Sequence, residues 1–393
     1  MTVDHIDVVG IVGAGTMGAG IAQVALEAGH EVVVYDVDAD AIAAGRARVR
    51  DGLERRARRD ERVGVDAERW VAERLERLRD VETVAGLAEE SDLVIEAAIE
   101  VLDLKRDIFR ALDDAAGADV ILATNTSALS VASIAEVATR PERVVGLHFF
   151  NPAPVMPLVE VVAATTTARS IAERAAGIVT GWGKTPVMSA DSPGFIVNRV
   201  NRPFTIEALR ILESGAAAIT AIDDALRAAG FPMGPFELMD LSGIDVYFAA
   251  ARAVWERLGR PARLRPSEIQ GRLVAEGNFG RKTGQGFYLY DEHGRRTTAA
   301  DAFAATADGG STPGEIVERV RLAVANEAFF ALGEEVADEE AIDLAMRLGA
   351  AHPEGPIAWA RRRGLRNVVE QLEALVLVEG RRFAPAPVLV ADA

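Results

Sequence analysis

Short apolar runs alternate with helix-like patterns over the first half of the chain, and this alternation is typical of a parallel β-sheet covered by helices. The runs that we interpret as strands lie at residues 6–12, 31–35, 92–98, 120–123, 143–147, 157–162 and 186–188. Helical spacing follows the first run up to Gly29 and recurs at residues 39–79 and 168–182. We therefore predict an α/β domain over residues 1–188.

From residue 189 onward the spacing of apolar residues is helical, apart from a polar stretch rich in Gly, Thr and Ala at residues 291–312. The pattern after this stretch repeats the pattern before it at a shift of 120 residues (316 − 196). The matched pairs are Arg199 with Arg319, Glu207 with Glu327, Asp223 with Asp343 and, one residue further on, Pro-x-Gly-Pro at 232–235 with 353–356. We predict all-α C-terminal domains formed by duplication: one copy at 189–290, a linker at 291–312 and a degenerate copy at 313–393.

The chain is acidic, with a formal net charge of −17 over 393 residues. This excess of negative charge argues against nucleic acid or an anionic membrane as a partner. No apolar run is long enough for a membrane span, and Asp4 and Asp7 stand where a signal peptide would be basic, so we expect a cytoplasmic protein. The absence of cysteine excludes disulfides, thiol nucleophiles and cysteine-ligated metals.

Lysine is rare and occurs only at Lys105, Lys184 and Lys282. An acidic, lysine-poor chain fits a salt-adapted protein, and a GC-rich genome would produce much the same bias. Because arginine is otherwise preferred so strongly, we expect lysine where a compact ammonium group is needed.

The strongest motif is Gly13-Ala14-Gly15-Thr16-Met17-Gly18, which lies between the first predicted strand and its helix. In this context Gly13 permits a tight turn, Gly15 lets the backbone approach a pyrophosphate, and Gly18 lets helix and strand pack closely. Asp36 ends the next strand, about 20 residues on, where a carboxylate accepts from a ribose hydroxyl and repels a 2′-phosphate. The motif predicts a Rossmann-type dinucleotide-binding domain that selects NAD over NADP.

A second candidate site lies where two apolar runs follow each other along the chain. His148 ends the first run, and Glu160 stands among valines in the second. A lone carboxylate in an apolar strand is unfavourable unless it is paired, and a His–Glu pair is what a general base with an orienting carboxylate requires. The alternative is a core histidine with satisfied hydrogen bonds and a glutamate on an edge strand.

Two further features have a structural and a functional interpretation. The arginines clustered at residues 55–59 form either a solvated helix face or a clamp for the phosphates of an acidic substrate. Ser127 follows the strand predicted at 120–123, and ligands of parallel sheets gather at such carboxyl ends. Ser127 could instead be the N-cap of the next helix.

Together these motifs resemble the L-3-hydroxyacyl-CoA dehydrogenase family, which includes the 3-hydroxybutyryl-CoA dehydrogenases. The resemblance covers residues 6–290, and the C-terminal repeat resembles a second C-terminal domain of the family. The motifs that carry it occur in the family order: GAGTMG, TNTSAL, GLHFFNPAPVMPLVEVV, DSPGFIVNR, PMGPFEL and GRKTGQGFY.

The resemblance implies NAD-dependent interconversion of (S)-3-hydroxyacyl-CoA and 3-oxoacyl-CoA, without a metal. It gives catalytic roles to Ser127, His148, Glu160 and Asn198. Besides the glycine motif, the cofactor contacts that it implies are Asp36, Glu100, Lys105, Ser127, Asn151 and Lys282. The family binds the CoA phosphates with basic and serine side chains in the helical hairpin after Asp36; this chain has arginines there, and we assign Arg56 and Arg59.

Two other functions are compatible with these residues. A relative acting on a small hydroxy acid such as gulonate would not use the arginine hairpin for CoA. A catalytically silent NAD-binding or structural protein would not need the intact set of Ser127, His148, Glu160 and Asn198. Because single-copy relatives pair through the helical domain, we expect either a homodimer or a monomer whose second copy imitates that partner; in this copy Glu318 replaces Asn198.

Overall fold

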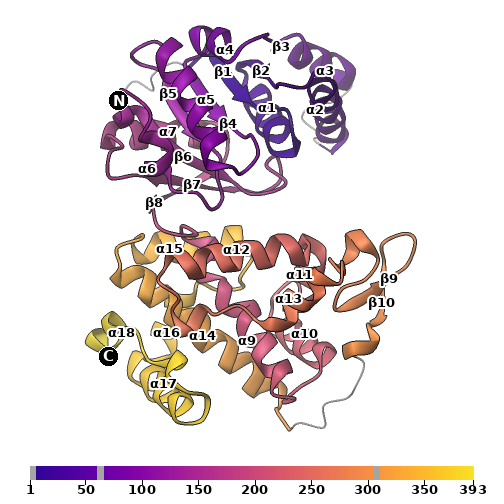
Figure 1. Ribbon diagram of the computed structural model, residues 1–393, viewed down its shortest axis with the longest axis vertical. Coiled ribbons are helices and arrows are strands. Elements are labelled where there is room, and N and C mark those ends of the chain that lie inside the picture. The colour runs from indigo at the N-terminus through magenta and orange to yellow at the C-terminus, as the bar shows by residue number, and fades with distance from the viewer. Residues whose placement is uncertain (1–5, 60–65, 304–309) are drawn as a thin grey trace. The chain divides into compact units, whose positions relative to one another are not determined.

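The computed structural model describes residues 6–59, 66–303 and 310–393, and the chain divides into two compact units, residues 1–192 and 193–393 (Figure 1). Asp4, residues 60–65 of the predicted helical stretch and residues 304–309 of the predicted linker lie outside the described residues. Within the described part of the chain, no helix combines the length and the apolar composition that a membrane crossing needs.

The first unit is built from strands and helices that alternate along the chain (Figure 1). Its elements are, in chain order, β1 (Val8–Val12), α1 (Thr16–Ala28), β2 (Glu31–Tyr35), α2 (Ala39–Arg59), α3 (Ala67–Leu75), β3 (Leu78–Asp80), α4 (Val84–Glu90), β4 (Leu93–Glu96), α5 (Leu102–Ala115), β5 (Ile121–Thr124), α6 (Val131–Ala135), η2 (Pro141–Arg143), β6 (Val144–Phe149), β7 (Leu158–Ala163), α7 (Arg169–Gly181) and β8 (Thr185–Ala190). The predicted domain boundary at residue 188 therefore falls inside β8.

The strands of this unit form one sheet in the order β3-β2-β1-β4-β5-β6-β7-β8. Neighbouring strands from β3 to β6 are parallel, β7 is antiparallel to β6, and β8 is parallel to β7. After β1 the chain adds β2 and β3 on one side of this strand, and it then returns to add β4, β5 and β6 on the other side. The strand order therefore reverses between β1 and β4. The carboxyl ends of β1 and β4 therefore form the crevice where sheets of this type bind their ligands.

The parallel strands are apolar because they are covered on both faces. Val9 and Ile11 of β1 and Ile95 of β4 are fully buried in the core of the unit. The sequence pattern does not predict β3, since Leu78 is the only buried residue of that short strand. The stretch predicted as helical at residues 39–79 therefore contains α2, α3 and the start of β3.

In the residues of it that the structure describes, the second unit is helical apart from one two-stranded hairpin. Its elements are α8 (Val197–Val200), α9 (Arg202–Glu213), α10 (Ile219–Ala228), α11 (Pro235–Ser242), α12 (Ile244–Arg257), η3 (Ala262–Leu264), α13 (Glu268–Ala275), η4 (Arg281–Thr283), β9 (Tyr288–Tyr290), β10 (Arg296–Ala299), η5 (Asp301–Phe303), α14 (Pro313–Gly333), α15 (Glu339–Gly349), α16 (Pro356–Arg363), α17 (Leu365–Glu379), η6 (Arg381–Phe383) and α18 (Pro387–Asp392). The predicted Rossmann-type α/β domain followed by helices is confirmed.

The hairpin corrects the predicted linker, because β10 lies inside that stretch and pairs with β9. The strand is mostly exposed and polar, so its sequence lacks the apolar alternation that would have indicated it. Asp240 anchors the hairpin from α11, since its carboxylate accepts from the backbone N–H groups of Phe287 at 3.0 Å and Tyr288 at 2.9 Å.

The helices α9 to α13 and α14 to α18 follow each other in the same order and share local contacts. Asp223 of α10 accepts hydrogen bonds from the first backbone N–H groups of α11, and Asp343 of α15 accepts them from the first N–H groups of α16. A Cβ on Gly234 would lie 2.3 Å from the Asp223 carboxyl group, and one on Gly355 would lie 2.2 Å from that of Asp343. The glycine before each proline thus makes room for the same helix cap.

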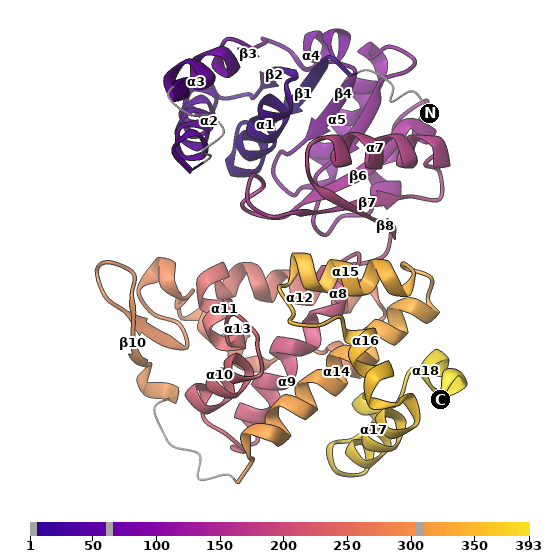
Figure 2. The same ribbon diagram turned by 180° about the vertical axis from the view of Figure 1, so that it is seen from behind.

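The two halves of the second unit exchange ion pairs. Arg199 Nε lies 2.8 Å from Glu327 Oε1, and Arg319 Nε lies 3.1 Å from Glu207 Oε2. At the shift of 120 residues these two pairs are images of each other, so the arrangement is that of a two-fold interface. Helices α9 and α14, which carry the acids, lie side by side in both views of the unit (Figures 1 and 2). Both segments therefore belong to one compact unit rather than to two.

Candidate active site

The glycine turn between β1 and α1 has the geometry that a dinucleotide requires. Gly13 has a φ of +102°, and a Cβ there would lie 2.8 Å from Ala97 O. A Cβ on Gly18 would lie 1.8 Å from Gly13 O, which the packing of helix against strand forbids. A Cβ on Gly15, in contrast, would meet no atom of the described residues within 4 Å, so the packing of these residues does not demand glycine there. The open space at Gly15 fits a pyrophosphate at the first turn of α1, beside Thr16 and Met17.

Asp36 lies just after β2 and braces this turn. Its Oδ2 accepts a hydrogen bond from Ala14 N at 2.8 Å, and its Oδ1 accepts one from Asp38 N at 3.2 Å. Each carboxylate oxygen has two lone pairs, so Asp36 retains capacity to accept from a ribose hydroxyl.

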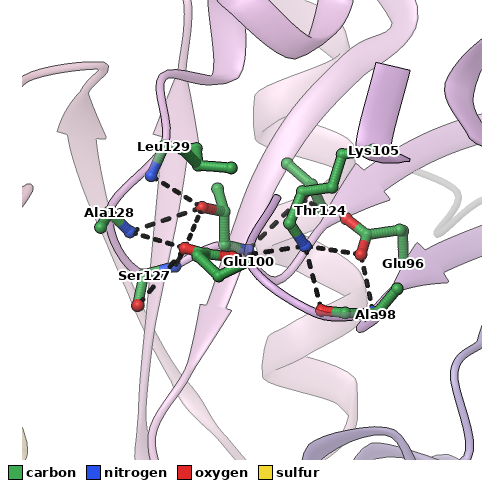
Figure 3. Close-up of polar contacts among 9 residues, drawn as sticks. Glu96, Ala98, Glu100, Lys105, Thr124, Ser127, Ala128 and Leu129 are labelled. Carbon is green, nitrogen blue, oxygen red and sulfur yellow. Dashed lines mark hydrogen bonds and ion pairs between the residues drawn. The ribbon is translucent and has the colours of Figure 1, made fainter. Parts of the chain in front are cut away.

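Glu100 organises the loop that follows β5 (Figure 3). One oxygen, Oε1, accepts from Thr126 Oγ1 at 2.6 Å, from Ser127 N at 2.8 Å and from Ala128 N at 3.0 Å. Ser127 Oγ also lies 3.4 Å from this oxygen. Burial would raise the pKa of Glu100, but the Lys105 charge and these hydrogen bonds outweigh burial and lower it. Glu100 therefore stays ionised and holds the Ser127 loop in place.

Lys105 stands behind Glu100 and is only 1% exposed. Its ammonium lies 2.6 Å from Glu96 Oε1, 3.3 Å from Ala98 O and 3.4 Å from Glu100 Oε2 (Figure 3). An ammonium has three donors, and these three acceptors can occupy them all. Lys105, which we predicted as a cofactor contact, contacts Glu100 and Glu96 in this structure.

Ser127 is not a helix N-cap. Helix α6 begins at Val131, and its cap is Ser130, whose hydroxyl accepts from Ser133 N. Asp191 accepts from Ser130 Oγ at 2.6 Å and from Ala132 N at 2.8 Å, which completes this helix start without Ser127. The structural alternative for Ser127 is therefore wrong.

His148 and Glu160 face each other across the antiparallel pair β6 and β7. His148 Nδ1 lies 2.6 Å from Glu160 Oε2, and both side chains are buried. When the proton of the neutral imidazole is on Nδ1, the Nδ1–H group donates a hydrogen bond to Glu160 and the lone pair of the ring is on Nε2. The proximity expected from the two apolar runs is thus observed. Because β7 lies between β6 and β8, Glu160 is not on an edge strand.

The arginines after Asp36 border a hollow of about 600 Å³, here called the arginine hollow. It lies among α1, α2 and the turn after β6, and Arg48, Arg55, Arg56, Arg59 and Asn151 line it. The third lysine, Lys184, fixes the turn, since its ammonium donates to Ala153 O at 2.6 Å and to Met156 O at 2.9 Å. Arg58 does not line the hollow and pairs with Glu54 at 3.0 Å.

Asn198 and Lys282 belong to the second unit. Asn198 lies in α8, where Arg202 Nε donates to its backbone oxygen at 2.7 Å. Lys282 lies in η4 and is paired with the Asp245 carboxylate at 2.7 Å. Among the residues that the structure describes, no group of three or more His, Asp or Glu side chains could hold a metal ion.

Sequence reasoning missed three residues that lie at the carboxyl ends of β2 and β4. Glu96 is fully buried at the end of β4 and pairs with Lys105, and the rule that singled out Glu160 would have found it. Val37 and Ile99, after β2 and β4, are 87% and 69% exposed. Exposed aliphatic side chains at these two strand ends suit the faces of an adenine ring.

A family model of the 3-hydroxyacyl-CoA dehydrogenase NAD binding domain matches residues 8–192, and the model of that family's C-terminal domain matches residues 194–290 and again 314–391. The chain therefore belongs to the 3-hydroxyacyl-CoA dehydrogenase family of NAD-dependent oxidoreductases. The family resemblance inferred from the motifs is confirmed.

Three relatives give the extent of this likeness. The chain is 36% identical to 3-hydroxyadipyl-CoA dehydrogenase of Escherichia coli (strain K12), with 98% of this chain and 97% of that protein covered. It is 40% identical to the human mitochondrial hydroxyacyl-coenzyme A dehydrogenase over 71% of this chain and 90% of the human protein. The crystal structure of 3-hydroxybutyryl-CoA dehydrogenase from Escherichia coli K12 matches with a TM-score of 0.88 and 36% identity, over 99% of this chain and 98% of that chain.

Proposed function

We propose that this protein oxidises (S)-3-hydroxyacyl-CoA to 3-oxoacyl-CoA with NAD, or catalyses the reverse reduction. The observation that carries the proposal is the buried contact of 2.6 Å between His148 Nδ1 and Glu160 Oε2. The glycine turn, Asp36 and Ser127 follow the carboxyl ends of β1, β2 and β5. Because β6 is parallel to these strands, His148 near its carboxyl end lies on the same side of the sheet, where the cofactor binds. The names of the relatives support an acyl-CoA as the substrate.

His148 acts as the general base of the oxidation in this proposal. Its Nε2 takes the proton of the substrate hydroxyl, and the Glu160 carboxylate stabilises the imidazolium that forms. Ser127 and Asn198 donate hydrogen bonds to substrate oxygens as negative charge develops. NAD, when bound, supplies the acceptor for the hydride. In the reverse direction the imidazolium returns the proton to the oxygen of the ketone.

In this proposal NAD contacts the residues of the glycine motif and those that the family motifs assign. The glycine turn and the start of α1 accept the pyrophosphate, and Asp36 accepts from the adenosine ribose. Glu100, Ser127, Asn151 and Lys282 are the further contacts that the family motifs assign. We place Lys105 behind Glu100 rather than against the cofactor, because its donors are directed at protein acceptors.

Acetoacetyl-CoA and NADH test the activity and the arginine hollow together. The full-length protein should oxidise NADH when acetoacetyl-CoA is added. The double variant Arg56→Ala, Arg59→Ala should raise the KM for acetoacetyl-CoA about 100-fold, about tenfold for each lost hydrogen bond to a charged group, and leave the KM for NADH nearly unchanged. Arg58→Ala on the same helix is the control, because Arg58 lies outside the hollow.

A different pattern would favour the alternatives. Turnover of a small hydroxy acid such as gulonate, with no effect of the double variant, would indicate the gulonate-type dehydrogenase. Binding of NADH without turnover of any of these substrates would indicate a catalytically silent relative.

Asp36→Ala should change the choice of cofactor. The variant loses the ribose acceptor and the charge that repels a 2′-phosphate, so the ratio of kcat/KM for NADH to that for NADPH should fall at least about tenfold. Steady-state rates with the two cofactors at fixed acetoacetyl-CoA measure this ratio. A wild-type enzyme that already prefers NADPH would contradict the role given to Asp36.

A further inference from the structure

Three arginines of the described residues are buried: Arg143, Arg199 and Arg202. Arg143 pairs with Asp113 at 2.7 Å, and Arg199 pairs with Glu327 at 2.8 Å. Arg202 is 5% exposed and, within the described part of the chain, forms no ion pair with an acidic side chain. A buried charge without an opposite charge is strongly unfavourable, so Arg202 needs an explanation that the fold of this acidic protein does not supply.

The contacts of Arg202 point to the predicted substrate residue Asn198. Arg202 Nε donates to Asn198 O at 2.7 Å, and Nη2 donates to Asn198 Oδ1 at 3.4 Å. The guanidinium carbon lies 4.8 Å from the centre of the Tyr247 ring. The third nitrogen, Nη1, is buried and has no hydrogen-bond partner among the described residues. The guanidinium thus has an unused donor group beside Asn198.

Comparison with the second helical copy shows which residues of this region the helix packing requires. Its helix α14 retains Arg319 and Glu327 at the positions of Arg199 and Glu207, which form the exchanged ion pairs. At the position of Arg202, however, it has Leu322, which is 2% exposed.

The same copy has Glu318 in place of Asn198, and this glutamate pairs with Arg363. The copy that lacks the Asn198 amide therefore also lacks the Arg202 guanidinium. An apolar side chain packs well at this point of the helix, so the structure does not require arginine there. Arginine at position 202 therefore occurs in the copy that has Asn198 and is absent from the copy that lacks this amide.

We propose that Arg202 binds a carboxylate at the far end of the acyl chain, so that the enzyme prefers 3-hydroxyacyl-CoA substrates that end in a carboxylate over those that end in a methyl group. This inference rests on the proposed function, which places Asn198 at the substrate oxygens. A carboxylate neutralises the buried guanidinium and accepts from its unused donors, whereas a methyl group leaves the charge uncompensated.

The spacing suits a short diacid. Arg202 Nη2 lies 3.4 Å from the side-chain oxygen of Asn198. A terminal carboxylate that is three carbon–carbon bonds of roughly 1.5 Å beyond carbon 3 spans a comparable distance. An acyl chain of six carbons therefore places its carboxylate within reach of the guanidinium when Asn198 holds the oxygen at carbon 3.

Two six-carbon substrates that differ only at the far end test the inference. With NAD and the full-length enzyme, kcat/KM for (S)-3-hydroxyadipyl-CoA should exceed that for (S)-3-hydroxyhexanoyl-CoA by about 100-fold. Arg202→Leu should reduce this ratio to about 1, and Leu322 shows that the helix accepts leucine at the matching position. Arg202→Lys should retain part of the preference. The control is Arg210→Leu on the same helix, which removes one of several arginine partners of Glu207 and should leave the ratio unchanged.

The contrary outcomes are distinct. A wild-type ratio near 1, or a high ratio that persists in Arg202→Leu, would show that Arg202 does not read a carboxylate. Equal losses on both substrates in Arg202→Leu would show that the arginine acts only by orienting Asn198. A wild-type enzyme that oxidises neither thioester would overturn the proposed function itself, and this inference with it.

Discussion

His148→Ala should lower kcat about 10³-fold while the dissociation constant for NADH stays close to that of the wild type. The variant removes the group that takes the hydroxyl proton, and a positioned acid or base typically contributes 10²–10⁴-fold to the rate. The glycine turn and Asp36 are untouched, so cofactor binding should persist. Steady-state rates with acetoacetyl-CoA and a fluorescence titration with NADH measure the two effects separately.

Glu160→Gln tests the second member of the pair. Glutamine can still hydrogen-bond to His148 Nδ1 but cannot stabilise the imidazolium by charge, so kcat should fall by about 10². His293→Ala is the control, since His293 is exposed in the second unit. A rate near that of the wild type in His148→Ala or Glu160→Gln would rule out the pair as the catalytic base.

A chain that ends at Asp291 should self-associate or aggregate. The full chain should keep its own oligomeric state under the same conditions. The truncation removes Glu327, leaves the buried Arg199 without its acid, and uncovers the face of α9 against which α14 packs. Because the ion pairs are exchanged in a two-fold manner, Arg199 of one truncated molecule can pair with Glu207 of another. Light scattering after size-exclusion chromatography compares the two chains.

The human relative supports this design. The match spans 71% of the present chain and already takes up 90% of the human protein, so the human protein has no room for a second helical copy. Adding Glu207→Ala to the truncated chain should weaken the association by removing the new partner of Arg199. A truncated protein that remains monomeric and melts at the temperature of the full chain would show that the second copy does not replace a partner subunit.

The cofactor turn could be predicted because all its signals are adjacent in the sequence. The strand, the glycines and the following helix each have a local pattern, and α1 ends at Ala28 with Gly29 at a φ of +102°, as the pattern predicts. The His148–Glu160 contact was also within reach, since each residue interrupts or ends an apolar strand and a hairpin-like reversal brings the two strands together.

The support of Ser127 could not be predicted in the same way. Glu100 and Ser127 are 27 residues apart, and they meet only because the sheet places β4 beside β5. The burial of Lys105 depends on Glu96 and on the backbone of the turn after β4, neither of which has a pattern of its own. Likewise the repeat indicated that two copies exist, but only the packed helices show that Arg199 meets Glu327.

Joining the two helical copies in one chain changes how their interface depends on protein concentration. Two separate subunits dissociate when their concentration falls below the dissociation constant, whereas two copies in one chain meet at an effective concentration that the linker sets. The interface of the helical unit is therefore insensitive to how much protein the cell contains. The tethered copy has Glu318 and Leu322 at the positions of Asn198 and Arg202, while it keeps Arg319, which pairs with Glu207 of the first copy.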